Sequence, residues 1–126
     1  LTLRNLGIYE KIIIVFGAGG DRDSGKRPIL GETACRFADK IIVTDDNPRT
    51  EDPEKIIGDI LAGCQKDADV TVINDRALAI RKAIEIKGKN DVVLIAGKGA
   101  ENYQITKSGK KFFSDRYEAE KSLGEA

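Results

Sequence analysis

The chain has 126 residues, of which 40% are hydrophobic, and this suffices for one domain with one core. Its 21 basic residues balance 21 acidic ones and no apolar run is long enough to cross a bilayer, so we expect neither a nucleic-acid nor a membrane partner. The absence of histidine excludes Ser-His-Asp and Cys-His catalysis within the chain, and no metal site is expected. Two widely separated cysteines, Cys35 and Cys64, and no recognisable signal peptide are typical of free, buried thiols in a cytoplasmic protein.

Predicted strands and helices alternate from the start of the chain. The β-branched run Lys11–Phe16 predicts a strand buried on both faces, and the glycine-rich loop Gly17–Arg27 leads from it to a helix that Pro28 opens. This helix is expected to bury an apolar stripe made of Ile29, Leu30, Ala34, Phe37 and Ala38, with Cys35 at its edge.

Three further strands are predicted, at Ile41–Thr44, Val70–Ile73 and Asp91–Ala96. An aspartate is placed to cap each of the two helices between them, Asp52 before Pro53 and Asp75 before the next helix. Their predicted apolar stripes are Ile56, Ile57, Ile60, Leu61 and Cys64 in the first helix, and Ala77, Ile80, Ala83 and Ile84 in the second.

The pattern changes near the C-terminus. Tyr103–Thr106 and Lys111–Phe113 flank a Ser-Gly turn signal and predict a β-hairpin, and a last helix is expected from about Asp115. The prediction is therefore one α/β domain over residues 1–126. Its Rossmann-like, open, mostly parallel sheet would be flanked by helices, and the hairpin would supply an antiparallel edge strand.

Open parallel sheets bind ligands beyond the carboxyl ends of their strands, which selects the loops Gly17–Arg27, Asp45–Asp52 and Gly97–Tyr103. In the first loop, the dinucleotide pattern GxGxxG fails because Arg22 stands where the third glycine belongs. The P-loop pattern GxxxxGK[ST] also fails at its end, since Arg27 replaces the hydroxyl residue. Either the glycines only permit a tight turn, or the turn presents Arg22, with Asp23 and Lys26, to a ligand.

The second and third loops hold complementary charges. Arg49 follows the rigid Asn47-Pro48 turn, and a guanidinium suits one carboxylate. Gly97 lets backbone approach a ligand, and Glu101 can accept hydrogen bonds from an ammonium group. Each loop alone could be a solvated turn, whereas together they suit a zwitterion such as an amino acid better than a nucleotide.

The order and spacing of four stretches resemble the C-terminal domain of a Mur ligase, of the group that adds the third amino acid of the peptidoglycan stem peptide (the UDP-N-acetylmuramoyl-tripeptide synthetases). The stretches are GGDRDSGKRP (Gly19–Pro28), TDDNPRTEDP (Thr44–Pro53), DRAxAI (Asp75–Ile80) and GKGAENYQ (Gly97–Gln104). The combination is specific and covers nearly the whole chain.

The resemblance implies an enzyme that uses ATP and Mg²⁺, through an acyl phosphate, to join an amino acid to UDP-MurNAc-L-Ala-D-Glu. It also implies that ATP and Mg²⁺ are bound mainly by a central domain, which like the N-terminal domain is absent from this chain, so that no catalytic residue is expected here and the chain alone would be inactive.

The resemblance further implies the residues that bind the incoming amino acid, namely Arg22, Asn47, Arg49, Gly97 and Glu101, with Asp23 and Lys26 near the phosphate. The motif Asp46-Asn47-Pro48-Arg49 is typical of members that add meso-diaminopimelate, whose second carboxylate can pair with an arginine, whereas lysine has none. The family often has Cys where this chain has Ala18 and His where it has Ala100, and Asn102 replaces a common Asp. Lysine therefore remains the alternative substrate.

Two other functions fit parts of the sequence. One is a free-standing nucleotide-binding NTPase that uses Gly20–Lys26, and the other is a non-catalytic amino-acid sensor.

Overall fold

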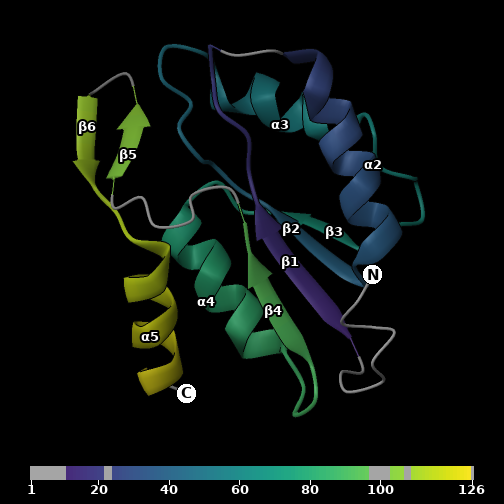
Figure 1. Cartoon of the computed structure of the whole chain (residues 1–126), viewed down its shortest axis with the longest axis vertical. Coiled ribbons are helices and arrows are strands. Elements are labelled where there is room, and N and C mark those ends of the chain that lie inside the picture. Colours follow the sequence, from purple (N-terminus) through teal and green to yellow (C-terminus); the bar gives the residue numbers. More distant parts are fainter. Residues whose placement is uncertain (1–10, 22–23, 97–102, 107–108, 126) are drawn as a thin grey trace.

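The computed structural model describes residues 11–21, 24–96, 103–106 and 109–125 (Figure 1). Four strands, β1 (Ile12–Phe16), β2 (Lys40–Val43), β3 (Val70–Val72) and β4 (Val92–Ile95), form one parallel sheet in the order β3-β2-β1-β4. Central strand β1 places Ile14 opposite Ile41 of β2 and Leu94 of β4. The predicted open, parallel α/β sheet is confirmed.

Helices cover both faces of this sheet: α2 (Arg27–Phe37) and α3 (Pro53–Leu61) on one, α4 (Arg76–Ile86) and α5 (Asp115–Glu125) on the other (Figure 1). A short 3₁₀ turn, η1 (Ser24–Lys26), leads into α2. Both predicted caps are confirmed, because Asp52 accepts from the Glu54 amide at 3.0 Å and Asp75 accepts from the Ala77 amide at 3.0 Å. Helices α3 and α4 thus begin where their capping aspartates place them.

The predicted apolar stripe of α2 is largely wrong. Ile29, Leu30 and Phe37 are exposed, and the buried residues of this helix are Arg27, Gly31 and Ala34. The reason is the close packing of α2 on α3: a Cβ on Gly31 would overlap the Ile60 carbonyl oxygen. The small residues therefore face α3. Leu30 and Phe37 instead line an apolar groove of about 340 Å³ that also involves β1 and β4, and its lining carries no charged side chain.

The hairpin exists, as β5 (Tyr103–Thr106) and β6 (Gly109–Phe112), but it supplies no edge strand to the main sheet. The two strands form their own antiparallel sheet, which Figure 1 shows apart from the four parallel strands. The backbone of Ile105 hydrogen-bonds to the loop after β2, accepting from the Arg49 amide (3.0 Å) and donating to Oδ1 of Asn47 (2.9 Å). These groups are therefore engaged by a loop rather than by the edge of β4.

Cys35 and Cys64 are free, as predicted, and half-buried. Burial, and to a lesser extent the neighbouring Cys35, raise the pKa of the Cys64 thiol to about 12. In the described part of the chain, no helix has the length and apolar character needed to cross a membrane.

Candidate functional site

Three neighbouring strands bring the candidate loops to one edge of the sheet. Strands β2, β1 and β4 are adjacent and parallel, so their carboxyl ends, at Val43, Phe16 and Ile95, share that edge. The chain moves from β1 to β2 on one side and later crosses to β4 on the other, which makes the space beyond β1 a topological switch point. The sheet therefore places the described parts of the first two loops together.

The predicted site residues divide into two groups. Asp46, Asn47, Pro48, Arg49 and Lys26 are described, whereas Arg22, Asp23, Gly97 and Glu101 lie outside the described residues. Lys26 is exposed at the start of α2, where it occupies the N-cap position without a side-chain cap hydrogen bond. The structure thus gives the geometry of the second loop most completely.

The first loop lies against the second. The Gly20 amide donates to the Asn47 carbonyl at 2.8 Å, and a Cβ on Gly20 would overlap the Pro48 carbonyl oxygen. Asp21 continues the contact, because its Oδ2 accepts from the Thr50 hydroxyl at 2.7 Å. Glycine is needed at position 20 for this close approach, so Gly20 does more than permit a turn.

Arg49 is anchored at both its backbone and its side chain. Its φ of 56° lies in the left-handed region that non-glycine residues rarely adopt, and its amide donates to Ile105. Nη1 of its half-buried guanidinium donates to the Gly20 carbonyl (3.1 Å) and the Asn47 carbonyl (3.2 Å). Its Nε and Nη2 have no hydrogen-bond partner among the described residues, which leaves an oriented cation able to receive an anion.

Asn47 is almost completely buried, with 4% of its surface exposed. Its Oδ1 accepts from the Ile105 amide and its carbonyl accepts from the Gly20 amide. Nearby, the Gln104 side chain donates to the Asp46 carbonyl at 2.8 Å. Asn47 therefore connects the second loop with both the first loop and the hairpin.

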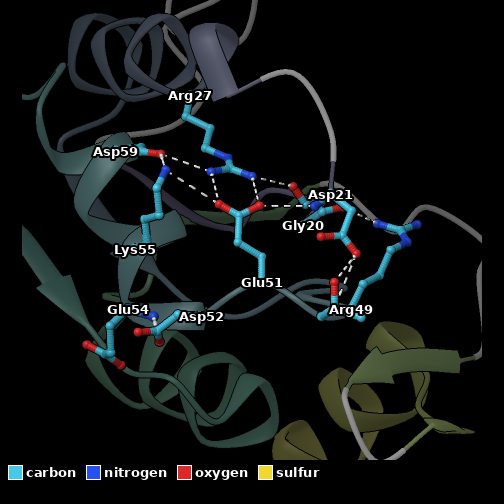
Figure 2. Close-up of polar contacts among 11 residues, drawn as sticks. Gly20, Asp21, Arg27, Arg49, Glu51, Asp52, Glu54, Lys55 and Asp59 are labelled. Atoms are coloured by element: carbon cyan, nitrogen blue, oxygen red, sulfur yellow. Dashed lines mark hydrogen bonds and ion pairs between the residues drawn. The ribbon is translucent and has the colours of Figure 1, made fainter.

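Sequence reasoning missed Arg27, the first residue of α2. Figure 2 shows its guanidinium facing Glu51 and Asp59; it donates to both Glu51 oxygens (2.7 and 2.8 Å) and to Asp59 (2.9 Å). These bonds, with burial opposing them, raise the pKa of Arg27, and chiefly the Arg27 bond lowers the pKa of Glu51 to about 2. The side chains of Arg27 and Glu51 therefore both stay ionised at neutral pH.

A second buried arginine, Arg76, was also missed. It donates from Nε and Nη2 to Asp115 at 2.6 and 2.8 Å, and to the carbonyls of Asp45 (3.1 Å) and Ala96 (3.0 Å). One signal was available for both arginines: each opens a helix, where the helix dipole disfavours a cation. Such a position calls for a specific anionic partner.

The arrangement suits recognition of a carboxylate better than binding of ATP with Mg²⁺. Arg27, which stands where a P-loop has its metal-binding hydroxyl, is occupied by Glu51 and Asp59. No cluster of three or more possible metal-ligating side chains occurs among the described residues. The described part of the first loop thus does not fit a nucleotide–metal site.

Comparison with known proteins connects this arrangement to one family. Residues 1–99 match the family described as "Mur ligase, glutamate ligase domain". A relative from Trichormus variabilis, named UDP-N-acetylmuramoyl-L-alanyl-D-glutamate–2,6-diaminopimelate ligase, is 55% identical over 94% of this chain and 24% of its own length. A relative of the same name from Prochlorococcus marinus is 55% identical over 90% of this chain and 22% of its own length.

A solved structure of an enzyme with that name superposes on the chain with a TM-score of 0.91 and 39% sequence identity, covering 98% of this chain and 26% of that one. The chain thus spans about a quarter of the length of the relatives that it matches.

Proposed function

The chain belongs to the Mur ligase family, and from that premise we propose that it is the C-terminal, amino-acid-binding domain of a cytoplasmic ligase that adds meso-diaminopimelate to UDP-MurNAc-L-Ala-D-Glu in peptidoglycan precursor synthesis. The names of relatives that are 50–55% identical support the choice of substrate. In this proposal residues 1–126 form one domain of the enzyme, and the N-terminal and central domains lie outside the chain.

One observation carries the proposal: hydrogen bonds within the protein orient the guanidinium of Arg49. The backbone contact with Ile105 and the side-chain contacts with the Gly20 and Asn47 carbonyls orient it. A preorganised guanidinium loses little freedom when it pairs with a carboxylate. Arg49 would therefore hold a carboxylate of diaminopimelate, and the domain would present the amino group to the acyl phosphate.

The residues that complete the proposed amino-acid site are Arg22, Asn47, Gly97 and Glu101, with Asp23 and Lys26 toward the phosphate. Asn47 would contribute mainly by holding the second loop, since its side-chain oxygen already accepts from Ile105. ATP and Mg²⁺ would be bound outside this chain, because Arg27 engages acidic side chains where a P-loop would hold metal. The chain alone would show no ligase turnover.

The test is steady-state kinetics of the full-length enzyme carrying Arg49→Ala. Loss of a charge-assisted hydrogen bond costs about 1.5–3 kcal/mol, so kcat/KM for meso-diaminopimelate should fall roughly 10- to 150-fold. Arg116→Ala is the matched control, since Arg116 is exposed on α5 and pairs only with Glu120 among the described residues. An unchanged kcat/KM in Arg49→Ala would remove Arg49 from the site.

A further inference from the structure

Two arginines outside the proposed amino-acid site occupy costly positions. Arg27 and Arg76 are the first residues of α2 and α4, with side chains only 2% and 0% exposed. The helix dipole opposes a cation at either position, and a buried charge destabilises the fold unless it is fully paired. Nε of Arg27, moreover, is buried without a hydrogen-bond partner in the described part of the chain. Stabilisation of the fold therefore does not by itself explain why an arginine occupies either position.

Arg27 connects the first loop with the second. One edge of its guanidinium binds Glu51, which ends the second loop's turn (Figure 2). Its Nη2 also donates to the Gly19 carbonyl of the first loop at 3.1 Å. Glu51 returns to the first loop through Oε1, which accepts from the Asp21 amide at 3.0 Å. The two loops are therefore joined through one cation and one carboxylate.

Arg76 connects the second loop with the end of β4. It donates to the carbonyl of Asp45, where the second loop begins, and to the carbonyl of Ala96, the residue directly after β4. Its pairing with Asp115 fixes the guanidinium from the side of α5. The second loop is thus held at its start by Arg76 and at its end by Arg27.

We propose that Arg27 and Arg76 are positioning residues for the amino-acid site: they set the place of the second loop, and so of Arg49, relative to the first loop and to the end of β4. The inference rests on the proposed function for the identity of the site. Each arginine uses several donors at once, which a planar guanidinium provides and a lysine ammonium on a flexible chain does not. Charge alone is therefore insufficient at either position.

The kinetic test uses the full-length enzyme with Arg27→Lys and Arg76→Lys. Misplacement of Arg49 should raise KM for the incoming amino acid about tenfold and leave KM for ATP within about twofold. Arg36→Lys is the matched control, because Arg36 is on the same helix as Arg27 but is 66% exposed, in an i,i+4 pair with Glu32. Ile80→Val, in the core of α4, controls for lost stability without a change at the loops.

A second readout does not depend on the substrate. The amide of Gly20 donates to the Asn47 carbonyl and so reports on the contact between the two loops. In the 126-residue chain, Arg27→Lys should speed hydrogen exchange of this amide about tenfold, whereas Arg36→Lys should leave it unchanged. Faster exchange, with a wild-type enzyme that uses no diamino acid, would keep the positioning role and refute the proposed function. The inference would be overturned if the lysine variants fold but change neither KM for the amino acid nor the exchange rate of the Gly20 amide. It would also be overturned if KM for ATP rises as much as KM for the amino acid. If the lysine variants do not fold, Glu51→Gln removes the charge of the carboxylate that pairs with Arg27. This variant must then raise KM for the amino acid and leave KM for ATP within about twofold.

Discussion

Replacement of Gly20 by alanine isolates the close contact between the first and second loops. The φ angle of Gly20 is not in the left-handed region, so alanine is excluded only by space: its Cβ would overlap the Pro48 carbonyl oxygen. The loops must separate, which stretches the bond from the Gly20 amide to Asn47 and the bond from Arg49 to the Gly20 carbonyl. Overpacking of this kind costs about 1–3 kcal/mol, and each weakened hydrogen bond adds up to about 1 kcal/mol.

We therefore expect Gly20→Ala to lower the free energy of unfolding of the chain by about 1–5 kcal/mol, measured by urea denaturation. Gly58→Ala is the matched control, because Gly58 is an exposed residue inside α3 and an added Cβ would meet nothing within 4 Å. That change should stabilise the chain by about 0.5–1 kcal/mol, since alanine favours a helix interior over glycine. Equal stability of Gly20→Ala and wild type would show that the two loops are not packed as described.

Three further predictions concern single side chains. The hydrogen bond with Arg27 chiefly lowers the pKa of Glu51 from 4.5 to about 2. The stabilising effect of this ion pair is therefore complete above pH 4.5 and is lost as the pH falls toward 2. Urea denaturation should show the stability difference between wild type and Glu51→Gln shrinking over that range. Because the pKa of Cys64 is raised to about 12, iodoacetamide should alkylate this thiol far more slowly at pH 8 than a free cysteine, as mass spectrometry of the digested chain can measure. Asp75→Ala removes the cap of α4 and should lower the midpoint of thermal unfolding, at a cost of about 1 kcal/mol.

Each of these has an outcome that contradicts it. A constant stability difference between Glu51→Gln and wild type from pH 5 to pH 3 would mean that Glu51 is not paired in the fold. Alkylation of Cys64 as fast as that of free cysteine would mean that burial does not raise the pKa of this thiol. An unchanged melting midpoint for Asp75→Ala would mean that Asp75 does not cap α4.

The sequence predicts elements whose signals are local. The β-branched run of β1 is sufficient for a buried strand, and Asp52 before Pro53 is sufficient for the start of α3, because both depend on neighbouring residues. The turn at Asn47-Pro48 likewise predicts the loop that contains Arg49. The family resemblance adds the expected role of that loop, which local physics alone does not provide.

What the sequence does not predict depends on partners far along the chain. Arg27 meets Glu51 24 residues away and Arg76 meets Asp115 39 residues away, so a charged residue becomes part of the core in each case. A pattern of apolar residues cannot reveal such burial, and it also misassigned Leu30, which faces the groove. The hairpin was predicted, but its place was wrong because Ile105 binds the second loop and not β4.

The most direct test of the central claim is product formation by the full-length enzyme with ATP, UDP-MurNAc-L-Ala-D-Glu and either meso-diaminopimelate or L-lysine. An oriented Arg49 predicts a strong preference for meso-diaminopimelate, whose second carboxylate lysine lacks. A preference for L-lysine would contradict the proposed role of Arg49 and would mean that other residues determine substrate specificity. Ala100 and Asn102 would then be the first positions to mutate. No product with either amino acid would contradict the proposed ligase itself.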